Sequence, residues 1–271
     1  MRLGCHCVLF RERIATETRA VLDGMASTGF EGVEMGARFF GTERKEFLQQ
    51  ALQKAGIELA ALHVGVPTQQ WVDDPDAAVA AVLEAARFIQ DFPNKNLTMS
   101  GQPVEDAVSA ARGMNRAALA CRELGVTLGY HNHATEFSVN GGAMYKALHD
   151  HAPDMNFAFD LGWVQKGGYG LYQVLEENRG RVAYVHLRDF AGVDYLPAEE
   201  TAVKEDYGPS AGTATPFYPD LGGGQTDFKK LLAYLSDYLP ADGWAIVEYE
   251  TGAQDFGRYK KAHDFLESQR S

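Results

Sequence analysis

Short apolar runs alternate along the chain with longer segments in which apolar residues recur at helical spacing. The repeating unit is an amphipathic helix, a glycine turn and an apolar strand. In ALQKAGIELAALH and ACRELGVTLGYH, Gly56 and Gly125 stand where a helix C-cap requires a positive φ. Asp74 before Pro75 predicts a helix start, with aspartate as the cap and proline at the first helical position. A single apolar stripe at helical spacing predicts another helix between Val104 and Cys121.

Eight strands are predicted within this alternation, near Leu3–Cys7, Gly32–Met35, Glu58–His63, Asn96–Met99, Thr127–His131, Asn156–Asp160, Val182–Leu187 and Trp244–Glu248. Strict alternation of strand and helix indicates a parallel sheet with right-handed crossovers. Eight such units in 271 residues favour closure into a (β/α)8 barrel. We therefore predict an α/β fold, a single TIM-barrel domain over residues 1–271.

One long irregular stretch, residues 190–225, is rich in glycine, proline, tyrosine and acidic residues. A loop of this length in a compact domain is usually functional or disordered. Because it follows the seventh predicted strand, we expect it to lie over the barrel mouth as a lid or substrate loop. A passive insertion is the alternative. The glycines at 222–224, followed by Thr226 and Asp227, predict a flexible turn that leads into a capped helix.

Charge and cysteine content narrow the classes of partner. The net charge of −12 argues against a nucleic-acid partner, which calls for a basic face. Three cysteines suggest a reducing compartment, and Cys5-His6-Cys7 is interpreted as a buried structural pair in preference to a metal clip. The N-terminus has no long apolar signal region, and no apolar run reaches the ~18 residues of a membrane span. We predict a cytoplasmic protein without a membrane partner.

Several strand-like runs in the second half of the chain end in residue types that bind metals. NFAFD ends in Asp160, VAYVH in His186 and WAIVE in Glu248. Such groups cost free energy in an apolar run unless they pair or bind a cation, and parallel strand ends converge at the barrel mouth. Together they predict a site for one divalent ion, Mn²⁺, Mg²⁺, Co²⁺ or Zn²⁺. Taken singly, Asp160 could instead cap a turn, and His186 could be a core histidine.

The fourth ligand falls near the end of the fifth predicted strand, where three candidates stand together. His131 and His133 share a face along a strand, and Glu136 comes just after it. We favour Glu136 narrowly as the fourth ligand, with His131 as the rival. The groups that do not bind the ion would hydrogen-bond substrate hydroxyls.

Further residues are candidates for contact with the substrate. Glu34 and His63 end the second and third strands, although surface or packing roles fit them equally well. Arg188 can hold an oxyanion, a carbonyl or a phosphate, or can form a salt bridge in its loop. Trp163 and Tyr169 can form an apolar wall for a sugar ring, or simply pack the rim.

Several motifs resemble the sugar phosphate isomerase/epimerase family of the xylose isomerase-like TIM barrels, in its YHNHxxEF-bearing branch. The motifs are YHNHATEF at 130–137, FDLGW at 159–163, HLRD at 186–189 and VEYE at 247–250, with FEGVEMG, ALHVG and LGGGQTDF elsewhere. The resemblance covers essentially the whole chain. It implies a divalent metal bound by strand-end carboxylates and a histidine, with Asp160, His186 and Glu248 at the family positions. Many relatives carry glutamate where this chain has His131, and the branch usually has lysine at the position of Arg188.

We predict a metal-dependent isomerase or epimerase of a sugar, keto-sugar or cyclitol, which acts through α-proton transfer and an enediolate. Glu248 and Glu136 would exchange the proton on opposite faces of the substrate. His63 and Arg188 would orient it and stabilise the developing charge. A metal-dependent lyase on the same site, a dehydratase or a keto-glycoside-cleaving enzyme, is the alternative. A non-catalytic sugar-binding barrel is more remote, and the charge disfavours an abasic-site endonuclease. Pairing of barrels through their mouth loops would give a homo-oligomer.

Overall fold

Eight parallel strands form a closed barrel in chain order in the computed structural model, which describes residues 1–190 and 219–270. The predicted α/β barrel is therefore confirmed. Each predicted strand is present to within a residue or two at its ends. The strands are β1 Arg2–His6, β2 Gly32–Gly36, β3 Glu58–Gly65, β4 Asn96–Ser100, β5 Thr127–His131, β6 Asn156–Asp160, β7 Val182–Leu187 and β8 Trp244–Val247.

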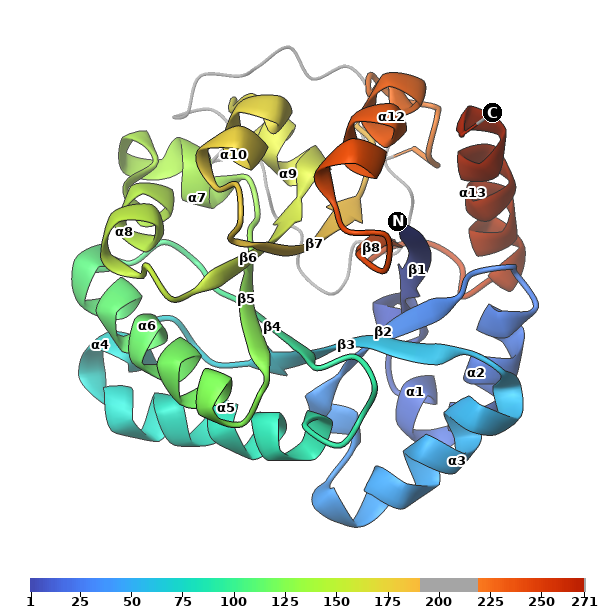
Figure 1. Ribbon diagram of the computed structural model, residues 1–271, viewed down its shortest axis with the longest axis horizontal. Coiled ribbons are helices and arrows are strands. Elements are labelled where there is room, and N and C mark those ends of the chain that lie inside the picture. Colours follow the sequence, from blue (N-terminus) through green and yellow to red (C-terminus); the bar gives the residue numbers. More distant parts are fainter. Residues whose placement is uncertain (191–218, 271) are drawn as a thin grey trace. The chain divides into compact units, whose positions relative to one another are not determined.

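Helices separate the strands along the chain, as the labels and colours of Figure 1 show. Within residues 1–190 and 219–270, short 3-10 helices lie at Cys7–Phe10, Ala37–Phe39, Thr42–Arg44 and Val139–Gly141. The α-helices within the same residues are α1 Arg13–Thr16, α2 Thr18–Ala26, α3 Lys45–Ala55, α4 Gln70–Asp73, α5 Pro75–Ile89, α6 Ala107–Glu123, α7 Thr135–Ser138, α8 Ala143–His151, α9 Leu161–Lys166, α10 Leu171–Glu177, α12 Phe228–Tyr238 and α13 Phe256–Gln269. In the described parts of the chain, no helix has the length and apolar character needed to cross a membrane.

The local signals in the sequence place the helix ends correctly. Gly56 and Gly125 adopt φ values of 68° and 69° at the ends of α3 and α6. The Asp74 carboxylate accepts a hydrogen bond from the Ala77 amide at 3.1 Å and caps α5. Asp227 caps α12 in the same way, which confirms the capped helix predicted after the glycine turn.

The chain divides into two compact units, and the first comprises the described residues within 1–60, 184–190 and 219–270. Here β1 pairs with β2 and β8, and β7 pairs with β8. His6 stands opposite Glu34 in the register of β1 and β2. Gly32 is required in β2, because a side chain there would collide with the ring of Trp244.

The second unit comprises residues 61–183, in which β3 pairs with β4, β4 with β5, and β5 with β6. Ser100 stands opposite His131 in the register of β4 and β5. These strands are apolar along their buried positions, so their polar ends are the exceptions. A single domain over 1–271 stays a prediction.

The cysteines are free and buried, as the structural interpretation of Cys5-His6-Cys7 requires. Cys5 lies in β1, whereas Cys7 begins the following 3-10 helix. Burial raises the pKa of both thiols well above the ordinary value. They stay protonated at neutral pH, and the protonated form is a poor metal ligand.

The predicted loop over the barrel mouth lies for the most part outside the described residues, in 191–218. Residues 222–226, which come later in the chain, fold onto the carboxylate of Asp189. Asp189 is 1% exposed. Oδ2 accepts hydrogen bonds from the amides of Gly222 at 3.0 Å and Gly224 at 2.8 Å. Oδ1 accepts from those of Phe190 and Thr226, each at 3.1 Å. Two of the motif segments, HLRD and LGGGQTDF, are thereby joined through one side chain.

Asp189→Asn is expected to lower the free energy of unfolding by about 3 kcal/mol. In either amide orientation, the new NH₂ group faces two backbone N–H donors that the carboxylate accepts in the wild type. Urea unfolding followed by circular dichroism measures the effect. Asp255→Asn is the matched control, because Asp255 is an exposed helix cap and asparagine caps equally well. Equal shifts in the two variants would show that the Asp189 hydrogen bonds add no stability.

Candidate metal centre

Asp160 ends β6 and is fully buried. Its Oδ1 accepts a hydrogen bond from the Trp163 amide at 2.9 Å and so caps α9. The side-chain amide of Asn132 makes two hydrogen bonds with the backbone of Asp160: it accepts from Asp160 N at 3.0 Å and donates to Asp160 O at 3.3 Å. Asp160 thus caps a helix, and a cap was the alternative to a metal-binding role for this residue. The cap uses Oδ1 and holds the carboxylate in one orientation.

Three histidine rings lie near the ends of β3 and β5 in the second unit. The ring of His131 is 6.1 Å from that of His63 and 5.3 Å from that of His133, between centroids. His63 is hydrogen-bonded through Nε2 to Ser100 Oγ at 3.1 Å. β5 ends at His131, so His133 lies in the turn beyond it, where its ring meets that of Trp163 edge-on at 6.0 Å.

Glu136 lies in the first turn of α7, with its carboxylate held by three neighbouring groups. Oε1 accepts a hydrogen bond from the Tyr130 hydroxyl at 3.0 Å. Oε2 accepts from the His133 amide at 3.0 Å and from the Thr135 hydroxyl at 3.1 Å. The residue is 1% exposed. The turn after β5 folds the Glu136 carboxylate back onto Tyr130 of that strand and onto His133 and Thr135 of the turn itself.

His186, in β7 of the first unit, is fully buried between two carboxylates. Its Nε2 lies 2.7 Å from Glu34 Oε2, and its Nδ1 lies 2.9 Å from Glu248 Oε2. Burial by itself would lower the pKa of this ring, but the attraction of Glu34 and Glu248 outweighs it and raises the pKa to about 10. Without an ion, His186 is therefore an imidazolium at neutral pH.

Glu248 directly follows β8 and shares its Oε2 between His186 and Arg188, whose guanidinium donates at 2.9 Å. Arg188 also donates to Glu250 at 3.0 Å and is 2% exposed. Burial would raise the pKa of Glu248, but the interactions with His6, Arg188 and His186, in that order, hold it well below the ordinary value. Glu248 is thus a carboxylate at neutral pH. Arg188 forms salt bridges with Glu248 and Glu250, and a salt bridge was the alternative to its role as a substrate contact.

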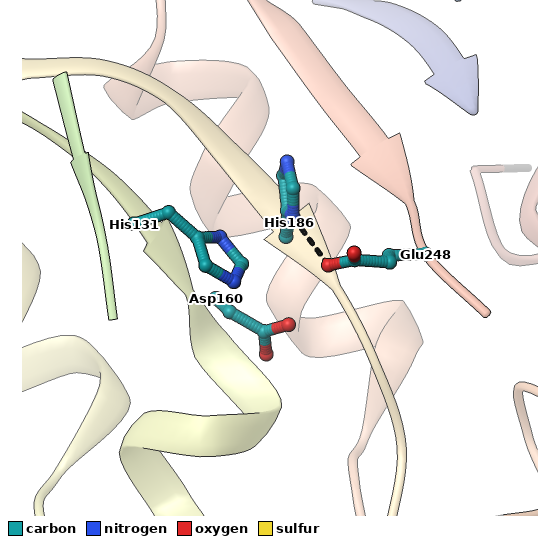
Figure 2. Close-up of side chains that lie close together, drawn as sticks. All are labelled: His131, Asp160, His186 and Glu248. Carbon is teal, nitrogen blue, oxygen red and sulfur yellow. Dashed lines mark hydrogen bonds and ion pairs between the residues drawn. The ribbon is translucent and has the colours of Figure 1, made fainter. Parts of the chain in front are cut away.

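Four buried side chains each offer a ligand atom within 4.8 Å of the others: His131, Asp160, His186 and Glu248 (Figure 2). The three predicted ligands are in this group. Its fourth member is His131, the rival candidate, and not Glu136. Two carboxylates and two imidazoles form a donor set that suits Mn²⁺, Co²⁺ or Zn²⁺, so these residues fit a single divalent ion. His6, Glu34 and His63 form a second group of the same kind.

Two further predicted residues are Trp163, which is buried, and Tyr169, which is half-buried. Trp163 is 2% exposed in α9, and its ring faces the Lys166 ammonium at 4.9 Å. The Tyr169 hydroxyl donates to Glu177 at 2.7 Å. Sequence reasoning missed Tyr184, whose hydroxyl donates to Glu34 Oε2 at 3.0 Å. The signal was available, since Tyr184 lies two residues before His186 and shares its face of the strand.

A closed parallel barrel with buried histidine and carboxylate groups beside its strand ends defines a class of TIM-barrel enzymes. The family model described as xylose isomerase-like TIM barrel matches residues 22–269, and the chain belongs to this family. The predicted membership of the xylose isomerase-like TIM barrels is confirmed, and the YHNHxxEF-bearing branch stays a prediction.

Several proteins that are similar to this chain are named as enzymes. An inosose dehydratase of Geobacillus kaustophilus is 27% identical over 250 residues, which cover 85% of this chain and 79% of that protein. A probable 3-DHS dehydratase of Bacillus anthracis has a TM-score of 0.75 at 13% identity and covers both chains fully. A D-allulose 3-epimerase of Methylomonas sp., solved in complex with D-allulose, has a TM-score of 0.70 at 15% identity over 99% of this chain and 97% of that one. The two structures show the shared fold, and the chain is an enzyme of the xylose isomerase-like TIM-barrel family, with inosose dehydratases among its relatives.

Proposed function

We propose that the chain is a metal-dependent enzyme that moves a proton beside the carbonyl of a sugar, keto-sugar or cyclitol. The supporting observation is the buried group of two carboxylates and two imidazoles. Asp160, His186 and Glu248 would hold the ion, with His131 as the fourth ligand. We favour His131 over Glu136 because three hydrogen bonds already fix the Glu136 carboxylate on its neighbours.

The reaction begins with proton transfer to a carboxylate of the chain. A bound divalent ion supplies Lewis-acid polarisation of the substrate carbonyl, which acidifies the neighbouring C–H bond. Glu248 takes this proton, because its low pKa keeps it ionised. Arg188, held by Glu248 and Glu250, fixes the orientation of that carboxylate. The substrate becomes an enediolate, and the side chains of His63, His133 and Trp163 line it.

Isomerisation or epimerisation completes the reaction when a proton returns at another carbon or on the other face. In this scheme Glu136 is the acid on the face opposite Glu248. Its carboxyl group contacts the hydroxyls of Tyr130 and Thr135, through which a proton can reach it. No atoms leave the substrate, so the product has the mass of the substrate.

Dehydration is a second candidate, and the inosose dehydratase of Geobacillus kaustophilus is the observation that favours it. The same C–H bond breaks, and its proton goes to Glu248. The neighbouring C–OH bond then breaks, a carbon–carbon double bond forms, and the hydroxide leaves as water with a proton from Glu136. The first step is common to both outcomes, so the ion and the base are the same.

Product mass in deuterated water separates the two outcomes. Mn²⁺-loaded protein is incubated with inososes and with ketohexoses, and the products are followed by mass spectrometry and NMR. An epimer is about one mass unit heavier than its substrate, because a deuteron replaces the proton at the reacting carbon, whereas a dehydrated product has lost one water. Bound sugar with neither exchange nor product would support the non-catalytic sugar-binding alternative.

Ion binding to the ion-free protein is expected to release about one proton at neutral pH. The pKa of His186 is raised to about 10, so its ring is protonated at pH 7 and must lose a proton before it can bind an ion. Ion affinity should therefore rise as the pH is raised toward 10, and the released proton should disappear above it. Calorimetric titration with Zn²⁺ in buffers of different ionisation enthalpy counts the proton. Binding at pH 7 without proton release would contradict the expectation.

The absence of a nucleic-acid partner, the cytoplasmic location and the homo-oligomer stay predictions.

A further inference from the structure

Glu34 is a fully buried carboxylate in β2 whose partners are side chains of the chain itself. A carboxylate in such a position costs free energy unless it is paired and hydrogen-bonded. Oε2 meets His186 Nε2 at 2.7 Å and accepts from the Tyr184 hydroxyl at 3.0 Å. Oε1 lies 3.5 Å from His6 Nε2. The groups that hold Glu34 thus come from β1, which precedes it in the sequence, and from β7, which follows it.

The tautomer of His6 follows from its other ring nitrogen. The Val8 amide donates to His6 Nδ1 at 2.9 Å, at the start of the 3-10 helix after β1. An acceptor nitrogen carries no proton, so the proton of the neutral ring is on Nε2 and is directed toward Glu34 Oε1. His6 is the register partner of Glu34 across β1 and β2, which keeps the two side chains adjacent.

These contacts leave the two nitrogens of His186 in different surroundings. Nε2 faces Glu34, whose position Tyr184 and His6 fix. Nδ1 faces Glu248, which belongs with His186 to the group of four possible ligands (Figure 2). A histidine that binds a metal usually donates its other ring N–H to a carboxylate or carbonyl, which sets the tautomer and the ring plane.

We propose that Glu34 is a positioning residue for the metal centre and not a contact for the substrate. It accepts the Nε2–H of His186, orients the ring, and leaves Nδ1 as the nitrogen that binds the ion. Tyr184 and His6 hold Glu34 in turn. The inference rests on the proposed metal centre.

Glutamine at position 34 tests the proposal because it is nearly isosteric but uncharged, with one acceptor oxygen in place of two. If its NH₂ replaces Oε2, it faces the Nε2–H of His186. If its NH₂ replaces Oε1, it faces the Nε2–H of His6. The first orientation sets the NH₂ against the Nε2–H of His186, and in the second the oxygen that faces His186 has lost its charge. In both cases the hold on the His186 ring is weaker than that of a carboxylate. Glu34→Asp keeps the charge and both acceptor oxygens at a shorter reach.

The experiment measures Zn²⁺ affinity by competition with a chromophoric chelator, together with Zn²⁺ stoichiometry. Glu34→Gln is expected to bind Zn²⁺ about 10–100-fold more weakly than the wild type, and Glu34→Asp to recover part of that loss. Glu177→Gln is the matched control, since Glu177 also accepts tyrosine hydroxyls, from Tyr145 and Tyr169, but is in neither group of possible ligands. Its affinity should equal that of the wild type.

A second measurement needs no variant at position 34. Long-range ¹H–¹⁵N NMR of the Zn²⁺-loaded wild type should show His186 protonated at Nε2 and metal-bound at Nδ1, with the signals assigned through their loss in His186→Asn. The reverse assignment would overturn the proposal even if Glu34→Gln failed to fold. Equal Zn²⁺ affinity in Glu34→Gln and the wild type would also overturn it.

Stoichiometry distinguishes the remaining outcomes. Loss of a second Zn²⁺ in Glu34→Gln, with the first bound as before, would make Glu34 a ligand in the group with His6 and His63 and would refute the positioning role. A wild type that binds no Zn²⁺ would refute the proposed metal centre itself, which is a different result from a variant that binds as well as the wild type.

Discussion

Replacement of Glu248 by glutamine is expected to lower kcat about 10³–10⁴-fold while the barrel remains folded. An amide can neither accept the α-proton nor offer an anionic oxygen to the ion. The change is nearly isosteric, and Arg188 keeps its second carboxylate partner, Glu250. We therefore expect the loss to appear in turnover and in α-proton exchange, and far less in the circular dichroism spectrum.

Glu250→Gln is the matched control for this variant. It removes the other carboxylate that binds Arg188, and Glu250 does not belong to either group of possible ligands. Its exchange rate in deuterated water should stay within a few-fold of the wild type. Full activity in Glu248→Gln, or equal losses in both variants, would refute Glu248 as the base.

Loss of the bound ion is the second large effect, expected when Asp160 and His186 are both changed to alanine. The wild type should carry close to one divalent ion per chain after loading with Mn²⁺ or Zn²⁺ and gel filtration. The double variant should carry almost none, because it removes one carboxylate and one imidazole of the group of four. Elemental analysis of both proteins measures the difference.

Asp160 also caps α9, so the loss of a cap must be separated from the loss of a ligand. Asp74→Ala serves this purpose, because it removes an exposed cap from α5 without touching a possible ligand. This control should retain the ion at some cost in stability, about 1 kcal/mol. A wild type that takes up no ion when Mn²⁺ or Zn²⁺ is supplied would remove the metal chemistry and favour the non-catalytic sugar-binding alternative.

The barrel could be predicted because its signals are local and periodic. Each strand is a short apolar run, and each helix carries an apolar stripe and recognisable caps, such as Asp74 before α5. The polar strand ends Asp160, His186 and Glu248 stand out because neighbouring positions in β6, β7 and β8 are apolar. A polar residue in such a position needs a partner, so the sequence shows where partners must gather.

The choice between Glu136 and His131 could not be made from spacing. It depends on the turn after β5, where the His133 amide and the Tyr130 and Thr135 hydroxyls hold the Glu136 carboxylate. Those hydrogen bonds form only when the turn adopts this particular conformation. Arg188 is a similar case, since Glu248 and Glu250 engage its guanidinium only after β7 and β8 pair.

The sequence by itself determined the alternation of strands and helices, the family, and the positions at which metal-binding residue types end their strands. These follow from periodicity and from the free-energy cost of polar groups in apolar runs, both of which act along the chain. Only the tertiary structure decided which groups share a proton or an acceptor: His186 between Glu34 and Glu248, and Glu34 beside His6 and Tyr184. Hydrogen bonds depend on distance and direction between residues remote in sequence, and the packing of the strands sets both.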